Sequence, residues 1–105
     1  MLILRGHTGP VRCLAYSPDS RTLASGNDDG KIKLWYLPSG RQRRTLTVAH
    51  SYDYPSRKDW VRAVAFTPDG KTLAAGDWNG CIRLWGFNSD SWFLRAGEGK
   101  FIRHY

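Results

Sequence analysis

This chain of 105 residues has little that predicts helices, membrane spans, disulfides or metal sites. Glycine, proline and aspartate interrupt it too often to leave a window long enough for a helix. It has no apolar run of about eighteen residues, the length that indicates a transmembrane helix. Its two cysteines, Cys13 and Cys81, lie in predicted strands, as is typical of buried, reduced thiols in a cytoplasmic protein. The three histidines have no cysteine or carboxylate partners at metal-ligand spacing, so we expect no metal and no cofactor.

The sequence does contain a long internal repeat. Residues 11–35 return as residues 61–85, and 13 of the 25 aligned positions are identical. Most of the other positions change mildly, as in Leu14 to Val64 and Tyr16 to Phe66. Self-similarity of this length indicates one supersecondary unit that is used more than once.

Each copy is predicted to form short strands that are joined by tight turns. Ser-Pro-Asp-Ser at residues 17–20 and Thr-Pro-Asp-Gly at residues 67–70 supply turn residues. Asp29-Gly30 and Asn79-Gly80 are hairpin signals. The strands of the first copy are expected at residues 11–16, 22–25, 31–35 and 43–48, and the second copy repeats them, with a weaker fourth strand at residues 92–95. Each unit is therefore predicted to be a four-stranded antiparallel meander.

The motifs of the repeat resemble those of the WD-repeat β-propeller family. They are Gly6-His7, then Val-x-x-x-Ala-aromatic-Ser-Pro-Asp, then Leu-Ala-Ser-Gly, then Asp-Gly-x-Ile-x-Leu-Trp. In that family each repeat is one four-stranded blade. The resemblance implies an all-β fold, with two four-stranded antiparallel WD-repeat blades of an incomplete β-propeller.

The resemblance also implies a hydrogen-bonded structural tetrad inside the blade. In the first repeat the matching residues are His7, Ser25, Asp29 and Trp35. In the second repeat only Trp85 matches cleanly. Ala75 and Asn79 replace the serine and the aspartate, and His50 stands seven residues too far upstream. We therefore expect the second blade to be less well fixed internally.

The expected organisation is a single WD-repeat region over residues 1–105. Residues 1–5 are interpreted as the outer strand of a preceding blade, residues 6–49 as repeat one, and residues 50–96 as repeat two with an insertion at 51–59. Residues 97–105 are interpreted as the start of a truncated third repeat.

Two blades would leave two apolar faces open, because a propeller blade packs on two neighbours. Three alternatives follow. The chain is a fragment of a larger scaffold, or a truncated gene copy without independent function, or a unit that completes the propeller by self-association.

The net charge of +7 raises nucleic acid or another acidic ligand as a partner. Arg41, Arg43 and Arg44 start the fourth strand, however, and edge strands often carry basic residues that prevent edge-to-edge pairing. We therefore rank nucleic acid below proteins or peptides, which are the partners that the resemblance implies.

A partner face is predicted from the loops. The insertion and the turn between the second and third strands should lie on the same side of the blades. That side would gather aromatic and basic residues of the types enriched at binding hot spots, or the tryptophans would merely pack on each other. The residues are Tyr52, Tyr54, Arg57, Lys58, Trp60 and Trp78.

Catalysis has little support. Ser25, His7 and Asp29 have the residue types of a hydrolase triad, but the family resemblance explains them as a structural network. No nucleophile-elbow G-x-S-x-G motif and no phosphate-binding glycine loop occurs. The sequence thus predicts a non-enzymatic protein–protein interaction platform, with an acidic-ligand or nucleic-acid module as the alternative.

Overall fold

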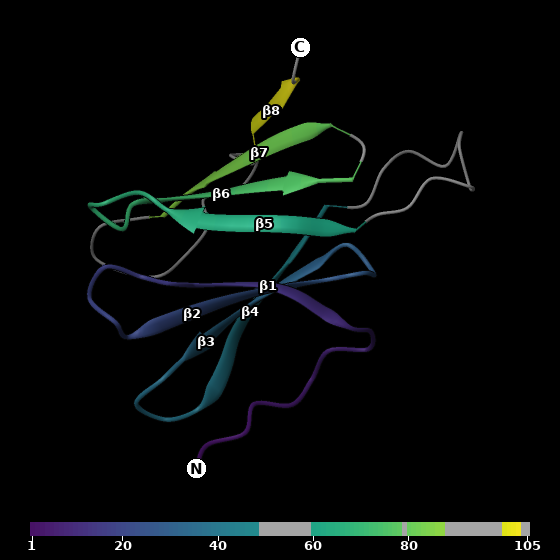
Figure 1. The fold of residues 1–105 in the computed structure, drawn as a ribbon. Coiled ribbons are helices and arrows are strands. Elements are labelled where there is room, and N and C mark those ends of the chain that lie inside the picture. The colour runs from purple at the N-terminus through teal and green to yellow at the C-terminus, as the bar shows by residue number, and fades with distance from the viewer. Residues whose placement is uncertain (49–59, 79, 88–99, 104–105) are drawn as a thin grey trace.

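The computed structural model describes residues 1–48, 60–78, 80–87 and 100–103, and the strands in these ranges form two antiparallel sheets (Figure 1). The first sheet has the order β1-β2-β3-β4 and the second β5-β6-β7-β8. The strands are β1 Val11–Tyr16, β2 Thr22–Asn27, β3 Lys31–Tyr36, β4 Arg41–Thr47, β5 Val61–Phe66, β6 Thr72–Asp77, β7 Cys81–Gly86 and β8 Lys100–Arg103. The predicted all-β fold of two four-stranded blades is confirmed. Within these ranges no helix is long and apolar enough to cross a membrane.

The turn between the first two strands of each sheet is built by the same hydrogen bonds. In the first sheet, Ser17 Oγ donates to Asp19 Oδ1 at 2.6 Å and the Arg21 amide donates to the same oxygen at 2.9 Å. Thr67 and Asp69 repeat the first of these bonds at 2.6 Å in the second sheet. These bonds lower the pKa of both aspartates, because they favour the charged carboxylate.

The fourth strand of the second sheet differs from the sequence prediction. It was expected at residues 92–95, which lie outside the described residues. In the structure β8 fills this place and pairs antiparallel with β7, from Cys81↔Arg103 to Leu84↔Lys100. Residues 100–103 therefore form the fourth strand of the second sheet, and the interpretation of residues 97–105 as the start of a third repeat stays a prediction. Without a fourth strand, the outer edge of β7 would have unpaired backbone groups. Which segment pairs with this edge depends on the tertiary structure.

Residues 1–5, interpreted from the sequence as an outer strand, form no strand in this structure. Met1, Leu2 and Ile3 are strongly exposed. A strand needs a neighbouring strand to which it is hydrogen-bonded, and none of the described strands pairs with this segment.

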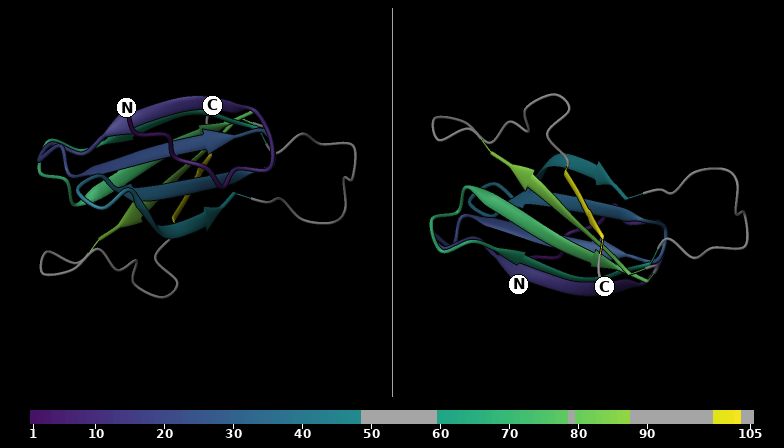
Figure 2. Two further views of the ribbon diagram at one scale, coloured as in Figure 1. Left: turned by 90° about the horizontal axis from the view of Figure 1, so that it is seen from below. Right: turned by 90° about the horizontal axis from the view of Figure 1, so that it is seen from above.

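The two sheets pack face to face around one apolar core (Figure 2). The core consists of Ala24, Ile32, Leu34, Leu46 and Val48 from the first sheet and its end, and of Val61, Leu73, Ala75, Trp85 and Phe87 from the second. The strand registers pair Ala24 with Leu34 and Leu73 with Trp85. Because paired residues share a face, one face of the first sheet covers the tryptophan-bearing face of the second.

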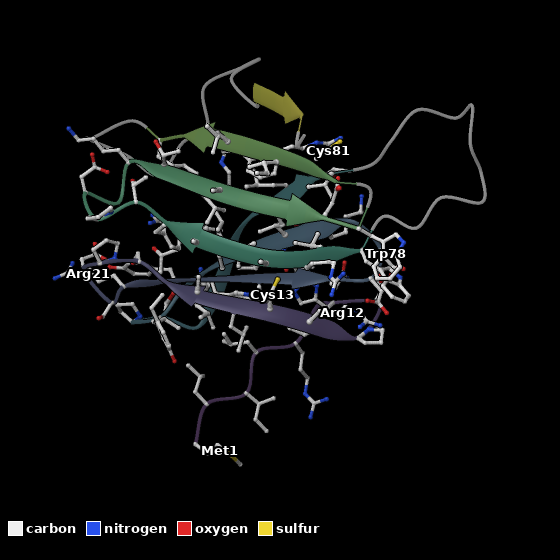
Figure 3. All side chains as sticks on the ribbon, turned by 45° about the horizontal axis from the view of Figure 1, so that its top comes forward. Met1, Arg12, Cys13, Arg21, Trp78 and Cys81 are labelled. Atoms are coloured by element: carbon white, nitrogen blue, oxygen red, sulfur yellow. The ribbon has the colours of Figure 1, made fainter. Side chains whose placement is uncertain are left out.

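β5 approaches β2 so closely that only glycine fits at one position. A Cβ added to Gly26 would lie 2.5 Å from Val61 Cγ1 and 2.7 Å from Cys13 Sγ. Val61 is fully buried there, and Cys13 Sγ lies 3.6 Å from the Val61 carbonyl oxygen. Figure 3 shows Cys13 between the two sheets. Sheet-to-sheet packing therefore explains this glycine, and burial raises the pKa of the Cys13 thiol.

Candidate functional site

Three of the four tetrad residues are joined by hydrogen bonds inside the first blade. Trp35 Nε1 donates to Ser25 Oγ at 2.8 Å, and Ser25 Oγ lies 2.5 Å from His7 Nε2. Because Ser25 Oγ accepts from the indole, its own proton is free to bond His7 Nε2. Burial lowers the pKa of His7, and the nearby Lys33 lowers it further.

Asp29 does not complete this network. Its Oδ2 accepts a 2.6 Å hydrogen bond from Thr8 Oγ1 at an exposed position, while buried His7 Nδ1 has no hydrogen-bond partner among the described residues. Asp29 still favours the protonated imidazole by charge. A hydrolase triad would need the carboxylate on Nδ1 and a serine that a substrate can reach. Ser25 is only 3% exposed and accepts the indole hydrogen bond of Trp35, so these residues form a structural network.

The second blade lacks the matching serine. Ala75 occupies that place in β6, and it is buried against the first sheet. Asn79 and His50 lie outside the described residues. Among the described residues no three His, Cys, Asp or Glu side chains gather in a way that could hold a metal ion.

The two tryptophans of the predicted partner face lie together. The ring centroids of Trp60 and Trp78 are 5.0 Å apart in an edge-to-face arrangement, and the Trp78 amide donates to the Trp60 carbonyl at 2.9 Å. Trp78 remains 46% exposed. The other four predicted residues of this face, Tyr52, Tyr54, Arg57 and Lys58, lie outside the described residues.

Two arginines stack on these rings. The guanidinium carbon of Arg12 lies 4.0 Å from the centroid of Trp60, and that of Arg62 lies 5.0 Å from the centroid of Trp78. Figure 3 shows Arg12 and Trp78 at the same end of the sheets. We call Arg12, Trp60, Arg62 and Trp78 the tryptophan face. Sequence reasoning missed both arginines, although the repeat alignment places an arginine at the same position in each copy.

The two arginines differ in charge pairing, and the repeat explains why. Arg12 forms an ion pair with Asp28, in which Arg12 Nη2 lies 3.2 Å from Asp28 Oδ2. The hydrogen bond to Asp28 raises the pKa of Arg12. In the second copy Trp78 stands where Asp28 stands in the first. Within the part of the chain that the structure describes, no carboxylate pairs with Arg62. The change from Asp28 to Trp78 between the repeats thus replaces an ion pair by an exposed arginine that stacks on an aromatic ring.

Comparison with known proteins places this fold in a family. The profile of the family "WD40: WD domain, G-beta repeat" matches residues 1–36 and 41–86, which is more than half of the chain. The chain therefore belongs to the WD40 repeat family.

Solved structures with the same arrangement support this assignment. The chain superposes on the WD40 repeats of RRP9 with a TM-score of 0.73 and 26% identity, over 97% of this chain and 28% of that one. The structure of U3-55K gives a TM-score of 0.75 and 28% identity, over 97% and 29% of the two chains.

Curated relatives match shorter stretches. The ribosome biogenesis protein BOP1 of Mus musculus is 49% identical over 47 residues, which are 45% of this chain and 6% of the relative. Apoptotic protease-activating factor 1 of Homo sapiens is 54% identical over 37 residues, which are 35% of this chain and 3% of the relative. The chain thus spans only a small part of the length of these relatives.

Proposed function

We propose that this chain is a non-enzymatic protein-interaction module that binds an acidic segment of a partner protein on its tryptophan face. The observation that carries the proposal is Trp78, a large exposed ring in a tight turn with Arg62 stacked on it. Trp, Tyr and Arg are the residue types that dominate binding hot spots. Membership of the WD40 family agrees with a role in protein assembly.

The chemistry of Arg62 favours an anionic partner. Its guanidinium is held over the Trp78 ring, so that its orientation is partly fixed before a ligand arrives. A planar guanidinium donates two parallel hydrogen bonds to a carboxylate or a phosphate group. The neighbouring Arg12 is already neutralised by Asp28, so it serves the site mainly by supporting Trp60. Arg57 and Lys58 lie outside the described residues, and only the sequence-based prediction assigns their positive charge to this face.

The relatives suggest the setting of this interaction. The BOP1 proteins are named as ribosome biogenesis proteins. We propose by analogy that the module works within a multiprotein assembly, where an acidic segment of a neighbouring subunit is its ligand. Binding nucleic acid is the alternative that the net charge of +7 raises.

The test compares two variants of this chain in a pulldown from lysate, with recovery expressed per folded molecule. Trp78→Ala should weaken recovery of the bound protein by about 30-fold, which corresponds to the hot-spot threshold of about 2 kcal/mol. The double variant Arg43→Ala/Arg44→Ala should change recovery far less, because both residues lie on the edge strand β4 and not in the tryptophan face. Thermal melts of both variants supply the folded fraction.

Three further measurements separate the explanations. Trp78→Phe keeps an aromatic ring against Trp60 and should retain most of the binding. Arg62→Ala should weaken binding of a glutamate-rich peptide, whereas Arg62→Lys should restore it only partly, because lysine cannot form the paired hydrogen bonds. Unchanged recovery per folded Trp78→Ala molecule would show that Trp78 is a packing residue. Tight, strongly salt-dependent binding of an oligouridylate instead of the peptide would favour the nucleic-acid alternative.

A further inference from the structure

The outward face of β6 and β7 repeats a face that is fully buried in the first sheet. We call its four residues, Ala74, Gly76, Ile82 and Leu84, the open face. The registers pair Ala74 with Leu84 and Gly76 with Ile82, so the four side chains share one side of the sheet. Their counterparts in the first sheet are Ala24, Gly26, Ile32 and Leu34.

The open face and its counterpart in the first sheet differ in how exposed their side chains are to solvent. Ile32 is 0% and Leu34 1% exposed under the second sheet, whereas Ile82 and Leu84 are only half-buried. The sequence of the open face is thus that of a buried interface, but nothing among the described residues covers it as the second sheet covers the first.

The matched glycines show what kind of surface fits there. A Cβ on Gly26 would collide with Val61 of β5, but a Cβ on Gly76 would meet nothing within 4 Å. Neither glycine has a positive φ, so backbone conformation requires glycine at neither position. Gly76 therefore keeps the space into which a valine on an incoming strand would fit, as Val61 fits over Gly26.

The same chain carries such a valine on its surface. Val11 of β1 occupies the position in the first repeat that Val61 occupies in the second, with an arginine following in both. Val61 is 0% exposed, and Val11 is 48% exposed. Both strands have a register irregularity directly after this valine, between Val11 and Cys13 and between Val61 and Ala63. The local geometry that aims Val61 at Gly26 is thus repeated at Val11.

We propose that a second copy of this chain docks on the open face, with its β1 laid across β6 and β7 and its Val11 over Gly76. This surface lies outside the tryptophan face and adds self-assembly to the proposed function. The interface is head-to-tail, because each copy offers one open face and one exposed Val11. Such heterologous contacts lead to rings when the rotation closes and to filaments when it does not. Each copy carries +7 net charge, so added salt should promote the assembly.

Two single variants test the interface from its two sides. Gly76→Val fills the space on the open face, and Val11→Asp places a charge on the incoming strand. Neither change should harm the fold, because Gly76 has open space and Val11 is half exposed. Circular dichroism melts check this for each variant. Sedimentation is then measured at several concentrations for the unaltered chain, each variant, and an equimolar mixture of the two.

The mixture makes the experiment decisive. The unaltered chain should sediment as assemblies larger than a dimer, and each variant alone should fall to the 11.9 kDa monomer. In the mixture, Val11→Asp still has an intact open face and Gly76→Val still has an intact Val11. One interface can form between them, so the mixture should give a dimer and nothing larger. A folded, unaltered chain that stays monomeric at every concentration would overturn the proposal. Assemblies that both variants retain, or a mixture of folded variants that gives no dimer, would also overturn it.

Discussion

Gly26→Ala should destabilise the chain strongly, whereas Gly76→Ala should not. The two glycines occupy the same position in the two repeats, and both substitutions add a single methyl group to the interior of a strand. At Gly26 the new Cβ would lie 2.5 Å and 2.9 Å from two atoms of Val61 and 2.7 Å from Cys13 Sγ. Val61 is fully buried and β-branched, so it has no free rotation by which to move aside. The sheets must separate slightly to admit the methyl group.

The loss of stability expected for Gly26→Ala can be estimated from the cost of overpacking a core. Forcing an extra methylene into a close-packed core costs about 1–3 kcal/mol. At Gly76 the Cβ meets nothing within 4 Å. Replacing glycine by alanine at a compatible position gains about 0.4–1 kcal/mol, because the unfolded chain loses freedom. The two variants should therefore differ by about 1.5–4 kcal/mol in the free energy of unfolding, from the two ranges combined.

Urea denaturation measures this difference, with intrinsic fluorescence as the signal. Both substitutions are made in the Val11→Asp background, so that self-association does not contribute to either value. In a thermal melt, each kcal/mol corresponds to about 4–8 °C for a domain of 60–100 residues. Equal stabilities of the two variants would refute the close approach of β5 to β2, and with it the packing of the two sheets described above.

Two further outcomes concern the tetrad. Ser25→Ala should cost about 1–3 kcal/mol, because it leaves the Trp35 indole without its acceptor, whereas Asp29→Ala should cost less because its hydrogen bond is exposed; urea denaturation of both variants ranks them. Acidification should also lower the free energy of unfolding. The pKa of His7 is lowered from 6.5 in the folded chain, so below pH 6.5 the unfolded chain takes up the proton first. Stability should fall from pH 6.5 downwards and level off below the lowered pKa, and His7→Gln should flatten this part of the pH profile. A profile that His7→Gln leaves unchanged would assign the loss to other groups.

The fold could be read from the sequence because its signals are local and occur twice. Turn residues such as Asp19 and Asp69 bond to amides within two residues of themselves, so they need no distant partner. The alternation of apolar residues in the third strands fixes which side chains share a face. Because the same turn and strand signals occur in both copies of the repeat, each copy supports the structure that the other predicts. For Trp60 and Trp78 the sequence allowed two alternatives, packing of the two rings on each other or binding of a partner.

Tertiary structure alone decided the remaining features. The outer strand beside β7 comes from residues 100–103, because edge pairing depends on which segment reaches the edge and not on local propensity. Asp29 accepts a hydrogen bond from Thr8 and not from His7. The spacing of residues in the sequence does not distinguish between these two neighbouring partners. The stacking of Arg62 on Trp78 requires two strands to lie side by side. Gly26 and Gly76 look alike in the sequence, and only the packing of the second sheet makes one of them indispensable and leaves the other open.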